Sequence, residues 1–194
     1  MSLEPIAFPP HPFWDASLRV YGREGVAESC LSLQDECGCD VNLLLFCGWV
    51  AAAGAGTLDA DSLRQLVERT LGWQADVVQP LREARRRLRR GHLGIAPDHT
   101  ESLRKRVQAL ELEAEHLEQL LLAGAVGLMP DDDGDDRYRG RDAADNMAVY
   151  FAVANIRRLG DWRRHLAILI HGFLPPLSLD QALEFVEAAF APAG

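Results

Sequence analysis

Four cysteines lie close together in the sequence and are the first candidates for chemistry: Cys30, Cys37, Cys39 and Cys47. Thiolates hold zinc when four of them converge, and zinc sites usually contain pairs spaced Cys-x2-Cys. Here only Cys37 and Cys39 are near neighbours, with one residue between them. The spacing predicts no metal site and favours small buried side chains at a helix contact, where Cys30 and Cys47 face each other if their helices run antiparallel.

An aspartate run is the second candidate, because residues 131–136 read Asp-Asp-Asp-Gly-Asp-Asp. Paired aspartates hold magnesium diphosphates in helical prenyl synthases, but composition alone produces the pattern here, and glycine is unfavourable inside a helix. The run also lacks the glutamate that closes a calcium-binding loop. We therefore expect a solvated linker or loop over residues 123–141. No phosphate loop, zinc-protease helix or nucleophile elbow indicates a catalytic residue or a cofactor.

A cluster of basic residues is the strongest charge feature. It comprises Arg82, Arg85, Arg86, Arg89, Arg90, Arg104, Lys105 and Arg106. Two predicted helices, over 73–90 and from 98 onward, fold back on each other around residues 91–97 and bring these cations to one end of a hairpin. The acidic residues between Glu111 and Glu118 are expected toward the opposite end, so that the hairpin is electrically polarised.

Three interpretations of this basic hairpin end stay open. A run of like charges is most often a solvated face. An acidic protein surface is the specific partner that we favour, because arginine pairs with carboxylates through two hydrogen bonds. Phosphate or nucleic acid is the third interpretation, and it is disfavoured because the chain carries a formal charge of -9 and shows no interleaved aromatic residues for base stacking.

A cluster of polar and aromatic residues offers an alternative site for a small ligand or a reaction. It consists of Trp14, Tyr21, Gln34, Asp35, Asp40, Asn42 and Trp49. Most of its polar members also suit helix caps, and Asp40 directly precedes an apolar helix. A deep pocket lined by these residues would favour this alternative over a protein with only shallow surface grooves.

The elements that position these residues are helices. Apolar residues recur at helical spacing along nearly the whole chain, and β-branched runs bounded by turn residues are absent. We predict an all-α fold: a compact multi-helix domain with a central apolar helix, which follows Asp40 and ends near Gly54, and a long antiparallel helical hairpin. Further helices are predicted at 13–21, 24–35, 59–71, 142–159, 161–171 and 178–190.

Local signals refine this pattern. The first helix of the hairpin is expected to kink or break at Pro80. The second is expected to start at an Asp98 cap and to pack a heptad-like stripe, from Leu103 to Leu121, against the first. A capping box is predicted at Ser178 and Gln181.

Length and composition bound the class of protein. With 194 residues, 48% hydrophobic and 25% charged, the chain suits one folded domain. Its longest apolar stretch, 41–55, falls short of the roughly 20 residues that a membrane-spanning helix needs. The first residues lack the basic start of a secretory signal. We therefore expect a cytoplasmic protein without membrane contact, whose cysteines stay reduced.

Two stretches of the sequence carry a family resemblance. The first contains Phe13-Trp14, Ser17-Leu18, Val20-Tyr21, Gly25-Val26, Cys30-Leu31, Leu33-Gln34, Gly38 and the segment from Asp40 to Trp49. The second contains Trp73, Val77-Val78, Pro80-Leu81-Arg82, Arg85-Arg86, Leu88-Arg89 and the segment from Glu111 to Glu115. Together they resemble a proteobacterial domain-of-unknown-function family of small helical proteins. The resemblance covers residues 12–122 and implies no catalytic residue.

These observations lead to one division of the chain and one favoured function. We expect a family-like helical domain at 12–122, the linker at 123–141, and C-terminal helices at 142–194 packed on the same domain. The favoured function is a non-enzymatic adaptor or regulatory protein-binding module that uses the basic hairpin end. The alternatives are an enzyme or small-ligand-binding protein that uses the polar and aromatic cluster, and phosphate or nucleic-acid binding by the basic end.

Overall fold

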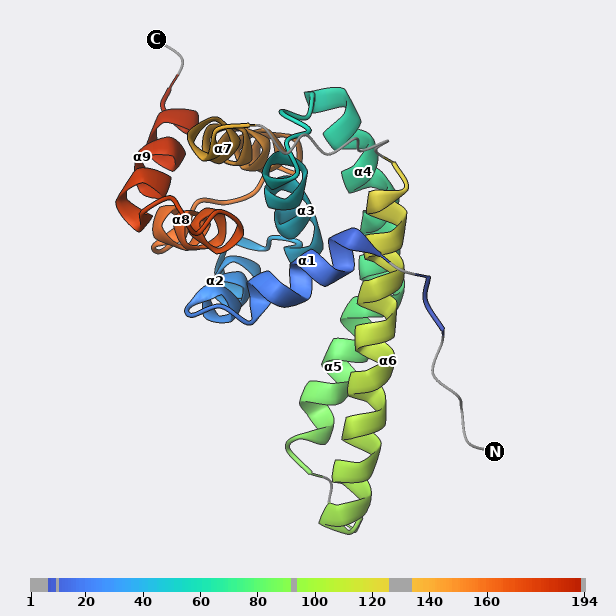
Figure 1. Cartoon of the computed structure of the whole chain (residues 1–194). Coiled ribbons are helices and arrows are strands. Elements are labelled where there is room, and N and C mark those ends of the chain that lie inside the picture. Colours follow the sequence, from blue (N-terminus) through green and yellow to red (C-terminus); the bar gives the residue numbers. More distant parts are fainter. Residues whose placement is uncertain (1–6, 10, 92–93, 126–133, 193–194) are drawn as a thin grey trace.

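The computed structural model describes residues 7–9, 11–91, 94–125 and 134–192, and every regular element within these ranges is helical. The all-α fold class is confirmed (Figure 1). The α-helices are α1 (Pro12–Tyr21), α2 (Val26–Ser32), α3 (Val41–Ala52), α4 (Ala60–Trp73), α5 (Gln79–Leu88), α6 (Pro97–Ala123), α7 (Asp136–Val153), α8 (Trp162–Phe173) and α9 (Leu179–Ala189). Two π-helices, η1 (Leu33–Cys37) and η2 (Gln74–Val78), directly continue α2 and α4.

Helix α3 lies at the centre of the core because it has almost no polar face. Asp40 caps its start, since the carboxylate accepts hydrogen bonds from the backbone N–H groups of Asn42 and Leu43. Every residue from Asn42 to Gly48 is buried, as are Val50 and Ala51. The predicted central apolar helix is thereby confirmed.

The C-terminal helices pack around α3 and share its core. Tyr150 and Phe151 of α7 and Phe185 of α9 are buried in one hydrophobic cluster with the leucines of α3. Figure 1 shows α7 beside α3, with α8 and α9 packed next to it. The hydroxyl of Tyr150 accepts a hydrogen bond of 2.8 Å from the backbone N–H of Asp40. Helix α7 therefore helps to fix the point where α3 begins.

Helix α7 starts earlier than the sequence predicted. Asp135 caps it by accepting a hydrogen bond from the backbone N–H of Arg137, so residues 136–141 are helical and do not belong to a loop. Gly140 lies inside this helix, where an added Cβ would come within 2.6 Å of Leu177 and 2.9 Å of Phe185. Close packing therefore requires a glycine at this position. At the other end of the predicted loop, α6 reaches Ala123, and residues 126–133 lie outside the described residues.

The two capping predictions have opposite outcomes. Ser178 and Gln181 form the predicted reciprocal capping box at the start of α9. The predicted Asp98 cap is wrong, because α6 begins at Pro97 and its N-cap is Ala96, which makes no side-chain hydrogen bond. Proline suits the first position of a helix, where the N–H group has no helical partner.

Helices α5 and α6 form the predicted antiparallel hairpin, which projects from the rest of the molecule (Figure 1). The break predicted at Pro80 does not occur. Instead the π-helix η2 precedes Pro80, and the chain stays helical from Ala60 to Leu88. The wide turn of a π-helix replaces α-helical hydrogen bonds with longer-range ones, and this accommodates a proline within a continuous helical run.

Helix α6 extends past the end of α5 (Figure 1), and this overhang decides which residues face each other. A symmetrical hairpin closed between Leu88 and Pro97 would place Arg82 level with Leu103. Arg82 instead pairs with Glu111 and Glu115. The shift corresponds to roughly 12 Å along the helix. The predicted separation of arginines from glutamates along the hairpin is therefore wrong.

Candidate functional site

A cleft of about 340 Å³ lies between α1, the start of α3, α5 and α6. Clefts of roughly 300 to 1,000 Å³ are the usual size for small-molecule sites. One part of the wall is apolar and consists of Trp14, Leu18, Tyr21, Leu31, Leu45 and Leu112. The remainder is polar and includes carboxylates, amides and guanidinium groups from five elements. The division into an apolar and a polar wall fits an amphipathic ligand.

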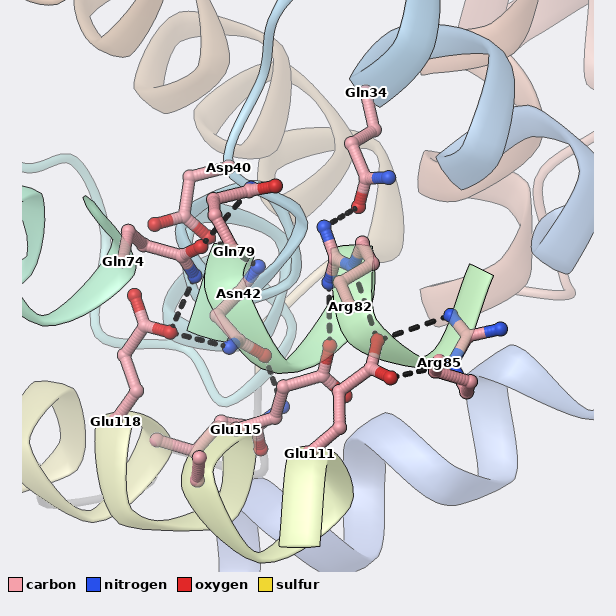
Figure 2. Close-up of polar contacts among 12 residues, drawn as sticks. Gln34, Asp40, Asn42, Gln74, Gln79, Arg82, Arg85, Glu111, Glu115 and Glu118 are labelled. Carbon is pink, nitrogen blue, oxygen red and sulfur yellow. Dashed lines mark hydrogen bonds and ion pairs between the residues drawn. The ribbon is translucent and has the colours of Figure 1, made fainter. Parts of the chain in front are cut away.

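Arg82 is the centre of the polar wall, and it is buried (Figure 2). Its Nε donates to Oε1 of Glu111 at 3.1 Å, and its Nη2 donates to Oε1 of Glu115 at 2.6 Å. Its Nη1 donates to Oε1 of Gln34 at 2.6 Å. One guanidinium group therefore joins α5 to α6 and to η1.

Two further arginines of α5 surround this centre. Arg85 donates to both carboxylate oxygens of Glu111. Burial acts to raise the pKa of Glu111, but the hydrogen bonds from Arg85 and Arg82 outweigh it and lower the pKa. Arg86 pairs with Asp35 at 3.2 Å on the exposed rim. Glu111 is thus held ionised between two guanidinium groups.

A second network of side chains lies at the start of α3. Nδ2 of Asn42 and Nε2 of Gln74 donate to the same oxygen of Glu118, at 2.8 and 2.6 Å (Figure 2). Nε2 of Gln119 donates to Oδ1 of Asn42 at 2.8 Å. These bonds connect α3, η2 and α6, and they hold the carboxyl group of Glu118 close to that of Asp40.

Carboxyl groups outnumber their guanidinium partners in and directly behind the polar wall. Asp40, Glu111 and Glu115 line the cleft, and Glu118 lies behind the wall beside Asp40. Of the three arginines in the lining, Arg82 and Arg85 pair with glutamates of α6 (Figure 2), whereas Arg86 pairs with Asp35 at the rim. Burial, followed by the negative charge of Asp40, raises the pKa of Glu118 to about 9. Burial also raises the pKa of Asp40 and that of Glu115, in the latter case against the opposing effect of Arg82. The site is therefore short of positive charge.

Both π-helices supply a glutamine to the cleft, Gln34 from η1 and Gln74 from η2. Single π-helical turns are rare and occur frequently at functional sites, because the extra residue in the turn changes the direction of nearby side chains. Two such turns beside one cleft mark this region independently of its charge.

Two cleft-lining side chains have buried polar atoms without a hydrogen-bond partner among the described residues. They are Oγ of Ser17 and Oε1 of Gln119. Such orphan atoms cost free energy unless a ligand or water satisfies them. Their position in the cleft wall is consistent with a polar ligand.

The polar and aromatic cluster proposed from the sequence divides into two groups. Its members Trp14, Tyr21, Gln34, Asp40 and Asn42 line the cleft. Asp35 pairs with Arg86 at the rim, and Trp49 stacks on Phe13, with ring centroids 4.9 Å apart. Asp35 and Trp49 therefore do not line the cleft.

The basic cluster is also divided. Arg82, Arg85 and Arg86 line the cleft. Arg89 and Arg104 line an adjoining groove on the hairpin, where Arg104 pairs with Glu101 at 2.7 Å. Arg90, Lys105 and Arg106 are exposed beyond this groove. The cluster is not one continuous exposed patch, because its first member is buried.

Sequence reasoning missed the acidic and amide side of the cleft. The missed residues are Ser17, Gln74, Gln79, Gln108, Glu111, Glu115, Glu118 and Gln119. A usable signal was present on α6, where Glu111, Glu115, Glu118 and Leu122 follow one another at steps of four, three and four. This spacing places them on one face of the helix, which is the face turned toward α5 and α3.

The four cysteines are free and buried. Burial raises the pKa of Cys30 to about 12, and it raises the pKa of Cys39 and Cys47 further. Sγ of Cys47 donates to the backbone carbonyl of Asn146 at 3.6 Å. The proposed contact between Cys30 and Cys47 stays a prediction. No group of three or more His, Cys, Asp or Glu side chains in the described ranges is arranged to hold a metal ion.

One further property concerns membranes. No helix in the parts of the chain that the structure describes combines the length and the apolar character needed to cross a bilayer.

Comparison with known proteins places the chain in a family. The model of a family described as "Protein of unknown function (DUF2390)" matches residues 12–122, the same range as the resemblance. Neither the curated proteins nor the solved structures gave a match. The matched range contains the whole cleft, from Trp14 of α1 to Gln119 of α6. Because the match covers more than half of the chain, this protein belongs to the DUF2390 family.

Proposed function

We propose that this protein binds a small molecule that carries a positively charged amino group on an apolar body, and that the cleft is its site. The observation that carries the proposal is that the four carboxyl groups in and directly behind the polar wall have only two guanidinium partners among the described residues, those of Arg82 and Arg85. An ammonium group would supply the missing positive charge. Opposite charges within a few ångströms strongly favour the ionised form of a carboxyl group.

The apolar wall supports the same ligand class. Trp14 and Tyr21 border the cleft beside the carboxyl groups, and aromatic faces attract organic cations. The chemistry of Tyr21 agrees, because burial, with a further contribution from the negative charge of Glu115, raises the pKa of its hydroxyl. An anionic ligand is disfavoured, since Arg82 already donates from Nε, Nη1 and Nη2 to protein acceptors.

Three probes with the same ring test the sign of charge: phenethylamine, 2-phenylethanol and phenylacetate. They present an ammonium, a hydroxyl and a carboxylate on one apolar body. The side-chain amide signals of Gln34, Asn42 and Gln74 in the NMR spectrum report on the cleft. We expect phenethylamine to shift these signals at the lowest concentration. Preference for phenylacetate, or no response to any of the three probes, would contradict the proposal.

A matched pair of variants tests whether the ammonium group of the ligand binds at the carboxyl groups of the cleft. Glu115→Gln removes a carboxylate from the cleft, whereas Glu113→Gln removes one from the same helix outside the cleft. Glu115→Gln is expected to weaken phenethylamine binding about tenfold or more, since a hydrogen bond to a charged group is lost. It should leave 2-phenylethanol binding unchanged, and Glu113→Gln should change neither.

The adaptor function is a second candidate, on a smaller surface than the sequence suggested. Arg89, Arg90, Lys105 and Arg106 are exposed, and no ion pair is seen for them in the described part of the chain. These four cations are available to pair with the carboxylates of an acidic protein surface. A location in the reducing cytoplasm is part of this proposal, and the four free thiols support it.

Reversal of charge at Arg89 and Arg90 to glutamate tests the second candidate. A poly-glutamate peptide is expected to bind the unmodified protein at low salt, to lose affinity as salt rises, and not to bind the variant. A single-stranded DNA probe distinguishes the nucleic-acid alternative. Tight binding of that DNA at physiological salt, with no binding of poly-glutamate, would exclude the acidic partner.

A further inference from the structure

Helix α6 carries a row of leucines that the fold leaves exposed. Leu103, Leu110, Leu117 and Leu121 have exposed fractions of 47%, 44%, 38% and 39%. The sequence predicted that this heptad-like stripe packs against α5, and for these four residues that prediction is wrong. The α6 face buried in the hairpin is instead the one that carries Glu111, Ala114 and Glu118. A long helix thus presents a coiled-coil-like seam that has no partner among the described residues.

The leucine row lies on the opposite side of the hairpin from the cleft. Gln108 and Leu112 line the cleft, and each is two residues from Leu110, or about 200° around the helix. On α5, Leu81, Ala84 and Leu88 follow one another at steps of three and four, and they do not line the cleft. The back face of the hairpin is therefore an apolar surface built from two helices.

Charged residues beside the row indicate what covers it. Arg106 lies four residues before Leu110, and Glu113 lies three residues after it. If a second α6 packs antiparallel with Leu110 at the two-fold axis, Leu103 faces Leu117 and each Arg106 comes close to a Glu113. In a parallel arrangement, Arg106 and Glu113 of one copy would lie on the opposite side of the seam from those of the other copy, and the two charges could not pair. Charge complementarity therefore favours an antiparallel second copy of this chain.

We propose that two copies of this protein associate through the back faces of their α5–α6 hairpins, with the two α6 helices antiparallel and centred on Leu110. The contact is isologous, since the same surface of both copies takes part. Each cleft stays open on the outer side of the resulting four-helix arrangement. The proposal is independent of the function assigned to the cleft.

Sedimentation equilibrium measures the association directly. The unmodified protein should sediment at twice the chain mass of 21.4 kDa. Leu110→Lys with Leu117→Lys should sediment as a monomer and keep its helical circular dichroism spectrum. Leu112→Lys is the matched control, because Leu112 is equally exposed on the same helix but faces the cleft. A monomeric unmodified protein, or loss of the dimer in the Leu112→Lys control, would overturn the proposal.

Exchange of the charges at Arg106 and Glu113 tests whether the two α6 helices pack antiparallel. Arg106→Glu alone and Glu113→Arg alone should each raise the dimer dissociation constant roughly tenfold, because two attractive contacts become repulsive. The double variant should restore dimerisation. Failure of the double variant to recover would exclude the antiparallel pairing.

Cysteine cross-linking provides a second readout of the same geometry. Leu110→Cys should form a disulfide between copies on mild oxidation, since the two-fold axis passes beside this residue. Leu103→Cys alone should not, but it should cross-link to Leu117→Cys in a mixture of the two variants. Cross-linking of Leu103→Cys with itself would indicate parallel packing and overturn the proposal.

Discussion

Arg82 Nη2 lies 2.6 Å from Oε1 of Glu115, and both side chains are largely removed from solvent. The same guanidinium group pairs with Glu111, so a single residue of α5 is bound to two carboxylates of α6. These contacts also bring η1 to the hairpin through Gln34. The stability of the hairpin and the shape of the cleft therefore depend on one buried cation.

Replacement of this cation should be costly. Arg82→Met leaves Glu111 with one partner and Glu115 without its guanidinium, and removal of one partner from a buried ion pair typically costs about 3 to 5 kcal/mol. Arg87→Met is the control, because Arg87 pairs with Glu83 on the exposed side of α5. An exposed pair contributes about 0 to 1 kcal/mol. Equal losses for the two variants in urea denaturation would contradict this account.

Glu118 should make stability fall as pH rises. Its pKa is raised in the folded protein from 4.5 to about 9, so between these pH values the folded state retains a proton that the unfolded chain has released. The contribution is fully present below pH 4.5 and is lost as pH approaches 9. The slope for one proton is at most about 1.4 kcal/mol per pH unit.

Glu118→Gln removes this titration and keeps an oxygen that can accept from Asn42 and Gln74. The free energy of unfolding, measured by urea denaturation from pH 5 to pH 9, should depend less on pH in this variant than in the unmodified protein. Glu68→Gln, at an exposed position of α4 outside both the network and the proposed dimer contact, should leave the dependence as it is. Identical slopes for all three proteins would show that Glu118 does not hold a proton in the folded state.

Gly140 should not tolerate a side chain. A Cβ at this position would lie 2.6 Å from Leu177 and 2.9 Å from Phe185, both of which are buried. Overpacking of a core typically costs about 1 to 3 kcal/mol. Gly72→Ala is the matched control, because nothing lies within 4 Å of its added Cβ. Thermal unfolding should show a loss for Gly140→Ala and a gain of up to about 1 kcal/mol for Gly72→Ala.

Hydrogen exchange should separate the central helix from the overhang of the hairpin. Backbone amides from Leu43 to Val50 should exchange most slowly, because they are enclosed in the core. Because Arg85 pairs with Glu111 near the end of α5, the segment from Glu101 to Arg106 lies past Leu88, and its amides should exchange much faster. Rapid exchange throughout Leu43 to Val50 in the folded protein would contradict the central position of α3.

The sequence was sufficient to predict the helices but not the acidic side of the site. On α6 the leucines from Leu103 to Leu121 form the stronger apolar pattern, and the usual reading places an apolar stripe inside. The face that is buried carries Glu111, Glu118 and Gln119 instead. Burial of the two glutamates is tolerated there because Arg82 donates to Glu111, and Asn42 and Gln74 donate to Glu118. That compensation comes from three other elements, so the spacing of these glutamates on one face of α6 could not by itself show that the face is buried.

The register of α5 against α6 could not be predicted from the sequence either. Periodicity showed that α5 and α6 exist and face each other, but the path of the connection between Leu88 and Pro97 sets how far one helix is displaced along the other. The sequence analysis selected Trp14, Tyr21 and Asp40 because aromatic and capping residues are conspicuous by type, and these three residues line the cleft. Glu115, by contrast, becomes a site residue only through this displacement.

The wide turn of η2 has a consequence for how this gene can change in length. Deletion of one residue from 74–78 would return the turn to ordinary α-helical spacing and rotate all of α5 by about 100° relative to α4. Arg82 would then point away from Glu111, although every residue of the charged network would still be encoded. Substitutions within η2 alter single side chains, whereas a change of one codon in number would disconnect the hairpin from the cleft. Descendants of this sequence are therefore expected to vary η2 in composition and to keep its residue count.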